Sequence, residues 1–188
     1  MEDHIYRVGE LFCGAGGLAL GAKMARAVDG SGRRYACELV WANDFNHWAC
    51  ETYRRNIGGH VIEGPVQDLR FEELAPIDGL MFGFPCNDYS VAGEHKGLDG
   101  SYGPLYTYGV KAINVHNPLW FLAENVSGLA SANEGEAFVR IMEDLRQAGM
   151  GYNVTTHLYR FEDYGVPQTR HRVILVGIRK DLNKTFRV

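Results

Sequence analysis

The feature that most constrains the fold is an expected strand that passes directly into a glycine-rich turn and then into a helical pattern. We expect residues 6–12 to form a first strand, and Cys13-Gly14-Ala15-Gly16-Gly17 follows at once. Small and apolar residues then recur at helical spacing over 18–28. Glycines let the backbone of such a turn approach a ligand and leave amide N–H groups free at the helix N-terminus. This order predicts an α/β fold with a nucleotide-type ligand on the turn. A tight turn that holds no ligand is the alternative.

Strands and helices alternate along the rest of the chain. Parallel strands separated by helices place their carboxyl ends at one edge of a sheet. A chain of 188 residues, 46% of them hydrophobic, is long enough for one domain with its own core. We expect further strands at 35–42, 61–62, 79–83, 119–123, 152–159 and 172–178, and helices at 45–56, 104–116 and 134–148.

Composition excludes several classes of protein. The net charge is −4, so no global basic field draws the chain to nucleic acid, and such binding needs a local basic face or a partner. The four cysteines show no C-x-x-C pairing, which argues against a zinc site and a secreted disulfide scaffold. No apolar run approaches the ~18 residues of a membrane span, and the acidic N-terminus is unlike a signal peptide. We therefore expect a cytosolic protein with reduced thiols, no metal and no membrane segment.

An acidic residue ends the second expected strand. A carboxylate at this position of a dinucleotide-type fold accepts hydrogen bonds from both ribose hydroxyls, which favours a ribose-binding role for Asp44. The next residue, Phe45, has an aromatic face on which an adenine can stack. Because 45–56 has a helical pattern, the N-cap of that helix is the alternative role of Asp44, and the two roles are compatible.

A cysteine behind a proline follows the fourth expected strand. Pro85 fixes its own backbone and favours extended geometry at Phe84, which holds the Cys86 thiol at the carboxyl edge of the sheet. Small and polar residues come next, with glycines at 93, 97, 100 and 103. This stretch fits a nucleophile followed by a mobile loop. A buried structural cysteine followed by a surface loop is the alternative.

Two further strands carry charged residues at or near their ends. Glu124 follows the fifth expected strand, so its carboxylate is expected at the same sheet edge as Cys86. Arg170 and Arg172 stand two residues apart at the start of the last strand, and we expect them to project to one side. The pattern predicts that a sulfur, a carboxylate and guanidinium groups share one edge of the sheet.

Four motifs occur in the order and approximate spacing of a known family. The motifs are Phe12-x-Gly14-x-Gly16-Gly17, Pro85-Cys86, Glu124-Asn125-Val126 and Gln168-x-Arg170-x-Arg172. With them the chain resembles the DNA cytosine-5 methyltransferases over essentially its whole length. The resemblance implies a doubly wound, Rossmann-like fold with a mostly parallel sheet and an antiparallel strand near the C-terminal end. It also implies S-adenosylmethionine as methyl donor and a cytosine flipped out of double-stranded DNA as substrate.

The resemblance implies catalytic roles for four residues. Cys86 would add as a thiolate to cytosine carbon 6, which makes carbon 5 nucleophilic enough to take the methyl group. Glu124 would hold ring nitrogen N3 and the amino group and would protonate N3, so partial burial of its carboxyl is expected. Arg172 would bind the base carbonyl oxygen, and Arg170 would orient the site or contact a phosphate. The loop after Cys86 would close over the base and exclude water.

The resemblance also implies a cofactor site, with three departures from the family pattern. Asp44 would bind the ribose where the family more often has Glu. Pro65 stands where the family usually has an acid for the adenine amino group, so Asp68 or the backbone would take that role. Asn87 stands where Gln is usual, which concerns DNA contact. The expected cofactor-binding residues are Phe12, Gly14, Gly16, Gly17, Asp44, Phe45 and Leu105.

Family members continue well beyond the last expected strand, with a region that reads the DNA sequence and a helix that completes the cofactor pocket. Three explanations for the end at Val188 are open: a split enzyme whose second chain carries the target recognition region, a truncation, or an inactive remnant. RNA cytosine methylation, a non-catalytic cofactor-binding fragment and an NAD-dependent oxidoreductase are the alternative functions. The expected location is the cytoplasm of a prokaryote, at the nucleoid.

Overall fold

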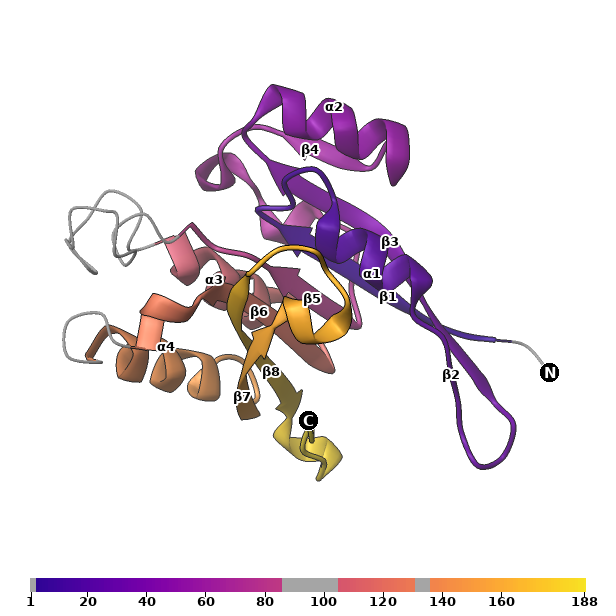
Figure 1. The fold of residues 1–188 in the computed structure, drawn as a ribbon, viewed down its shortest axis with the longest axis vertical. Coiled ribbons are helices and arrows are strands. Elements are labelled where there is room, and N and C mark those ends of the chain that lie inside the picture. The colour runs from indigo at the N-terminus through magenta and orange to yellow at the C-terminus, as the bar shows by residue number, and fades with distance from the viewer. Residues whose placement is uncertain (1–2, 86–104, 131–135) are drawn as a thin grey trace. The chain divides into compact units, whose positions relative to one another are not determined.

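The computed structural model describes residues 3–85, 105–130 and 136–188 (Figure 1). Two compact units make up the chain, Met1–Phe82 and Gly83–Val188. The expected nucleophile Cys86, and the loop that follows it, lie outside the described residues. No helix within the described ranges is long and apolar enough to cross a membrane.

A mostly parallel sheet forms the framework of the first unit. The elements are β1 (His4–Leu11), α1 (Gly17–Met24), β2 (Ala27–Val28), β3 (Arg34–Asp44), α2 (His47–Asn56), β4 (Val61–Glu63) and β5 (Gly79–Phe82). The strands lie in the order β2-β3-β1-β5, with β4 paired to β3, and only the β2–β3 pair among them is antiparallel. Leu11 of β1 pairs with Asn43 of β3 on one side and with Phe82 of β5 on the other. The segments that follow these three strands therefore begin at one edge of the sheet.

The first helix is shorter than the sequence predicts. The helical pattern over 18–28 was expected to form one helix, but α1 ends at Met24 and the backbone of Ala25 is extended, with ψ of 130°. The chain then enters the hairpin of β2 and β3, which projects from its unit in Figure 1. Asp29 fixes the turn, because its carboxylate accepts hydrogen bonds from the N–H groups of Ser31 and Arg33. Such side-chain to backbone bonds compete with a helix.

Antiparallel strands form the sheet of the second unit. The elements are α3 (Tyr106–His116), β6 (Trp120–Val126), α4 (Glu136–Gln147), β7 (Tyr152–Arg160) and β8 (His171–Arg179). The strands lie in the order β6-β8-β7, and β8 is antiparallel to both neighbours. The predicted α/β class, with mostly parallel strands and an antiparallel strand near the C-terminal end, is confirmed. The other expected strands and helices are present in the described residues, with ends that differ by a few residues.

Apolar side chains fill the interior of each unit. In the first unit Leu11, Leu80 and Phe82 come from neighbouring strands and are fully buried. In the second unit Ile141 and Leu145 stand one turn apart on α4 and are also fully buried, as its amphipathic pattern predicts. Burying a side chain of this size contributes roughly 1.5–3 kcal/mol. These cores hold in place the strand ends from which the expected site residues come.

Candidate active site

The glycine-rich turn between β1 and α1 adopts a backbone conformation that favours glycine. The φ angles are +52° at Gly14 and +96° at Gly16, both in the left-handed region. A Cβ atom at Gly16 would lie 2.6 Å from Cγ1 of Ile57 and 3.0 Å from Cδ2 of Tyr53. At Gly14 and Gly17 a Cβ atom would meet nothing within 4 Å. Gly16 is thus required for packing inside the unit, whereas there is open space at Gly14 and Gly17.

Backbone N–H groups hold both carboxylate oxygens of Asp44. Its Oδ2 accepts a hydrogen bond of 2.8 Å from the N–H of Gly14. Its Oδ1 accepts one of 2.9 Å from the N–H of Asn46. The residue is buried at the end of β3. Because each carboxylate oxygen has more than one acceptor direction, Asp44 is able to accept further hydrogen bonds from hydroxyl groups.

A different residue caps helix α2. The side-chain oxygen of Asn46 accepts a hydrogen bond of 3.0 Å from the N–H of Ala49, and the helix begins at His47. The N-cap alternative for Asp44 is therefore wrong, because the helix starts later than the pattern over 45–56 indicates. Asp44 instead connects the glycine-rich turn to the segment in front of this helix.

The other side chains expected at the cofactor differ in exposure. Phe45 is 68% exposed immediately after β3, which leaves room for a stacked ring. Phe12 is half-buried and has a φ of +55°. Leu105, in the second unit, is half-buried and immediately precedes α3. These observations place the residues within their own units without assigning them a ligand.

A buried asparagine fixes the loop that carries Pro65. The Nδ2 group of Asn43 donates hydrogen bonds to the carbonyl oxygens of Ile62, at 3.0 Å, and Gly64, at 2.9 Å. Asp68, the expected substitute for an acid at the Pro65 position, is exposed at the end of a short 3-10 helix. Sequence reasoning missed Asn43, although a polar amide inside an apolar strand is a signal for a buried hydrogen bond.

Glu124 and Arg172 form an ion pair between β6 and β8. The Nε atom of Arg172 lies 2.7 Å from Oε1 of Glu124. The antiparallel register pairs Arg172 with Val126, two residues from Glu124, so both charged side chains lie on one face of the sheet. The Glu124 side chain is 23% exposed and that of Arg172 is 18% exposed. The structure therefore brings these two expected residues together in a partly buried environment.

Arg170 lies just before β8, and Glu162 holds its main chain. The N–H of Arg170 donates to Oε2 of Glu162 at 3.2 Å, and its carbonyl oxygen accepts from the N–H of Phe161 at 2.9 Å. The other carboxylate oxygen of Glu162 lies 2.6 Å from Nε2 of His171. Hydrogen bonds from its own backbone N–H and from His171 lower the pKa of Glu162. Glu162 thus orders the loop in front of Arg172. Sequence reasoning missed this role because the residue stands in an irregular segment.

Asn125 connects β6 to the segment that leads to Cys86. Its side chain is buried and donates from Nδ2 to the carbonyl oxygen of Phe84 at 3.2 Å. Its Oδ1 accepts from the N–H of the next residue at 2.8 Å. Gly83 lies close to Glu124, the residue before Asn125, because a Cβ atom at Gly83 would be 3.2 Å from Oε2 of Glu124. The backbone at 83–84 is therefore in contact with two successive side chains of the Glu124-Asn125-Val126 motif.

The described cysteines lack the features of a nucleophile. Cys13 and Cys50 are buried and Cys37 is half-buried, all as free thiols. Burial raises the pKa of each of these three thiols, which disfavours the reactive thiolate. The prediction of a reactive thiol therefore depends on Cys86. Within the described ranges, no group of three or more His, Cys, Asp or Glu residues is placed to hold a metal ion.

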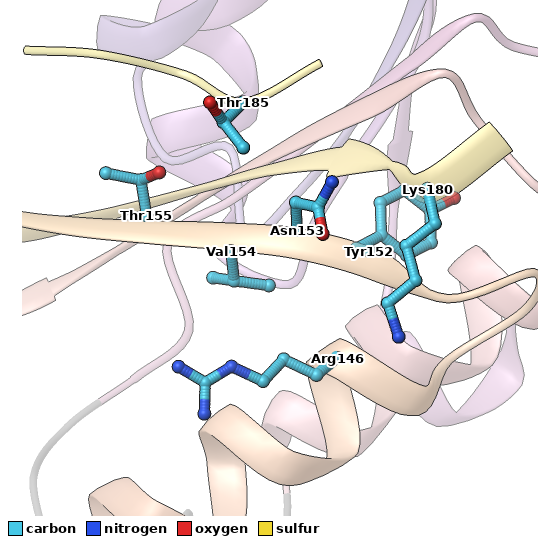
Figure 2. Close-up of a pocket in the computed structure, with 7 residues that line it drawn as sticks. All are labelled: Arg146, Tyr152, Asn153, Val154, Thr155, Lys180 and Thr185. Carbon is cyan, nitrogen blue, oxygen red and sulfur yellow. The ribbon is translucent and has the colours of Figure 1, made fainter. Parts of the chain in front are cut away.

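A surface hollow of about 290 Å³ lies at the far end of β8 from Arg172 (Figure 2). Figure 2 shows Arg146 extending toward it from α4, and Thr185 on the C-terminal segment. Lys180 follows Arg172 by eight residues, which is roughly 26 Å along an extended strand. The hollow is therefore separate from the Glu124–Arg172 pair. Its lining residues are Arg146, Tyr152, Asn153, Val154, Thr155, Lys180 and Thr185.

Nearly the whole chain fits one known family. Its sequence matches the family profile of C-5 cytosine-specific DNA methylases over residues 6–188. The chain belongs to the C-5 cytosine-specific DNA methylase family. Membership in this DNA methylase family confirms the resemblance carried by the four motifs. It gives no support to membership in a family of NAD-dependent oxidoreductases, the alternative from the glycine-rich turn.

Two bacterial proteins and one solved structure are similar to this DNA methylase chain. The chain is 56% identical over 193 residues to the Type II methyltransferase M.BbvI of Brevibacillus brevis. This match covers 97% of the chain and 52% of that protein. It is 41% identical over 179 residues to the Type II methyltransferase M.NgoFVII of Neisseria gonorrhoeae, covering 94% of the chain and 45% of that protein. A crystal structure described as a DNA modification methyltransferase from an E. coli prophage matches with a TM-score of 0.76 and 26% identity, over 97% of this chain and 49% of that one. The chain thus spans about half the length of the relatives it matches.

Proposed function

We propose that the chain is the catalytic part of a DNA cytosine-5 methyltransferase, which transfers a methyl group from S-adenosylmethionine to carbon 5 of a flipped-out cytosine. The observation that carries the proposal is the Glu124–Arg172 ion pair, next to the segment that leads to Cys86, in a member of the DNA methylase family. Because the chain spans about half the length of its relatives, the activity is proposed for the chain together with a complementing C-terminal part. A second chain that carries the target recognition region is one source of that part.

The first unit offers groups that fit S-adenosylmethionine. The open space at Gly14 and Gly17 leaves room for the methionine part of the cofactor, beside the N–H groups at the start of α1. The remaining acceptor capacity of Asp44 suits the ribose hydroxyls, and the exposed ring of Phe45 suits the adenine. When bound, the cofactor supplies an electrophilic methyl group. Phe12, Gly16 and Leu105 complete the proposed set of cofactor-binding residues.

Residues of the second unit would activate the cytosine. The Cys86 thiolate forms a bond to carbon 6, while Glu124, whose carboxyl must be protonated at this step, donates its proton to N3, so that carbon 5 becomes enamine-like. Arg172 holds the base carbonyl oxygen and, through its ion pair, orients Glu124. After methyl transfer a base removes the proton from carbon 5, the bond between carbon 6 and sulfur breaks to restore the thiolate, and the proton on N3 returns to Glu124. Arg170 orients the loop or contacts a DNA phosphate.

A covalent trapping assay tests this proposal. The chain is co-expressed with the C-terminal half of M.BbvI, and the purified pair is incubated with S-adenosylmethionine and a DNA duplex that contains 5-fluorocytosine. Because carbon 5 carries fluorine in place of hydrogen, a base has no proton to remove there, and the bond between carbon 6 and sulfur does not break. We therefore expect a protein–DNA adduct on a denaturing gel. Cys86→Ala should abolish the adduct, and the matched control Cys37→Ala should retain it. Binding of cofactor and duplex without an adduct, or an adduct in Cys86→Ala, would refute the mechanism.

The substrate and location are part of the same proposal. Double-stranded DNA is the proposed substrate because the matched family is a family of DNA methylases. A transfer RNA that contains 5-fluorocytosine, used in the same assay, distinguishes the RNA alternative by which nucleic acid is trapped. The bacterial sources of the two named relatives support a location in the cytoplasm of a prokaryote, at the nucleoid.

A further inference from the structure

A buried carboxyl group lies beside the glycine-rich turn and has no role in the proposed chemistry. Glu10 is the penultimate residue of β1 and is 1% exposed. Within the part of the chain that the structure describes, its Oε2 atom has no hydrogen-bond partner. A buried carboxylate with unfilled acceptor sites is strongly unfavourable, whereas a buried carboxylic acid is neutral. Glu10 therefore holds a proton in this structure.

The surroundings of Glu10 come from three elements and favour the neutral acid. Burial, with a smaller contribution from the carboxylate of Asp44 on β3, raises the pKa of Glu10 to about 8. The N–H of Ala19 on α1 and the hydroxyl of Tyr53 on α2 stabilise the ionised form of Glu10 and oppose this rise. The remaining titratable neighbour on the turn is the thiol of Cys13, which burial keeps uncharged. A positive charge placed near this group would shift the balance toward the carboxylate.

Polar side chains lie between Glu10 and the solvent. Tyr53 is fully buried, and its hydroxyl oxygen lies 3.1 Å from Nε2 of His60. The two rings also make an edge contact, with their centroids 5.4 Å apart. His60 is only half-buried at the start of β4. Tyr53 and His60 thus stand between the buried carboxyl of Glu10 and the solvent, because His60 is partly exposed.

The environment of His60 keeps its ring ready to accept a proton and pass it on. Burial and the nearby ammonium of Lys23 lower the pKa of His60, and the carboxylate of Glu38 on β3 opposes them. The ring is therefore neutral near pH 7, and Nε2 is free to accept from the Tyr53 hydroxyl in one of its two tautomers. Burial also raises the pKa of Tyr53, so its hydroxyl transfers a proton only when it receives another.

We infer that Glu10 is a proton-releasing residue of the cofactor site, which becomes ionised when a positively charged ligand binds on the glycine-rich turn. This inference rests on the proposed function, because S-adenosylmethionine carries the required positive charges on its sulfonium and its ammonium. The new carboxylate stabilises the cation electrostatically. The role is distinct from that of Asp44, whose oxygens are already held by N–H groups.

The proton transfer balances without a further reactant. The O–H bond of Glu10 breaks and its proton passes to the Tyr53 oxygen, while the Tyr53 proton passes to Nε2 of His60. The imidazole then gives the proton on Nδ1 to water and returns to a neutral tautomer. One proton leaves the protein for each cation bound.

The proton release gives ligand binding a definite pH dependence. Because Glu10 is protonated before binding and ionised after it, affinity for the cation rises as pH increases toward 8, by up to tenfold per pH unit, and then becomes constant. S-adenosylhomocysteine is a matched ligand that lacks the sulfonium charge. It should release less proton than S-adenosylmethionine and show a weaker dependence on pH.

Calorimetric titration at pH 7 of the chain paired with the C-terminal half of M.BbvI tests the inference. Each ligand is titrated in two buffers whose ionisation enthalpies differ, since the difference in heat counts the protons released. We expect up to one proton with S-adenosylmethionine, fewer with S-adenosylhomocysteine, and none in Glu10→Gln. Tyr53→Phe removes a hydroxyl group that favours the ionised form of Glu10, so it should move the proton release to higher pH. Glu51→Gln should leave the release unchanged.

The outcomes separate this inference from the proposed function. Binding of both ligands with equal proton release, or release that persists in Glu10→Gln, overturns the inference and leaves the proposed function intact. If Glu10→Gln fails to fold, the comparison of the two ligands on the unchanged chain still decides. Absence of binding by either ligand counts against the proposed cofactor site itself.

Discussion

Arg172 and Glu124 lie 2.7 Å apart across two antiparallel strands, with less than a quarter of either side chain exposed. Removing one partner of such a pair leaves the other charge partly buried and uncompensated. We expect Glu124→Gln and Arg172→Met each to lower the free energy of unfolding by about 1–3 kcal/mol. The double variant should lose less than the sum of the two, and urea unfolding measures the difference.

An exposed ion pair in the first unit provides the control for this cycle. Arg70 and Glu73 lie 3.1 Å apart, with side chains 77% and 67% exposed. Their coupling should fall below about 0.5 kcal/mol, since solvent screens exposed charges. Equal coupling in the two cycles would contradict the importance of burial for the Arg172–Glu124 pair.

Asn125 is expected to position the segment that leads to Cys86. Asn125→Ala removes the buried hydrogen bond from Nδ2 to the carbonyl oxygen of Phe84, which should lower stability by about 1 kcal/mol. In the complemented enzyme, kcat should fall about tenfold or more, since small displacements of a nucleophile have large effects. The affinity for S-adenosylhomocysteine should not change. Asn153→Ala is the control, because its side chain makes a similar bond to the Lys184 carbonyl at the surface.

We expect alanine substitutions at the neighbouring residues Gly16 and Gly17 to have opposite effects on stability. Gly16→Ala combines a φ of +96° with a Cβ atom 2.6 Å from Ile57, so it should destabilise the protein by about 1–3 kcal/mol or more. Gly17→Ala introduces a good helix former into open space at the start of α1, and should be neutral or stabilise by about 0.5–1 kcal/mol. Thermal unfolding of both variants checks this contrast. Equal shifts in Tm would contradict the described turn.

Glu10 gives the folded protein a stability that falls as pH rises. Its pKa is about 8 in the folded state against a usual 4.5, so between these values the folded state holds a proton that the unfolded state has lost. The free energy of unfolding should therefore decrease from about pH 4.5 to about pH 8, by on the order of a few kcal/mol, and then level off. Glu10→Gln should remove this slope. Denaturant unfolding at pH 6 and pH 8 measures it, and parallel slopes in both proteins would refute it.

Strand ends could be predicted from the sequence because apolar runs and the polar residues after them are local signals. The residues before Phe12 and Glu124 form strands in the structure, and the parallel pairing of β1 with β3 aligns the glycine-rich turn with Asp44. The contact between Arg172 and Glu124 is different, because the antiparallel register that creates it depends on pairing between distant parts of the chain. The sequence could place each residue on a strand, but the distance between them had to come from the structure.

The features that sequence reasoning missed depend on hydrogen bonds between residues whose pattern looks ordinary. The turn at Asp29 interrupts a stretch of small residues that has a helical period. Asn46 rather than Asp44 caps α2, because two polar residues stand close together and only backbone geometry distinguishes them. Glu10 sits in an apolar strand, and its burial follows from the packing of α1 and α2 around it rather than from its neighbours in sequence.

The two N–H groups that hold Asp44 also bear on how a ligand would arrive there. The hydrogen bonds from Gly14 and Asn46 already restrict rotation of the Asp44 carboxylate. Binding of a hydroxyl group therefore carries little further entropic cost for ordering this side chain. Residues Gly14 and Asn46 belong to the segments after two different strands, which makes the acceptor rigid with respect to both. A ligand that matches this fixed acceptor keeps more of its binding energy, and a ligand that needs the carboxylate elsewhere is rejected.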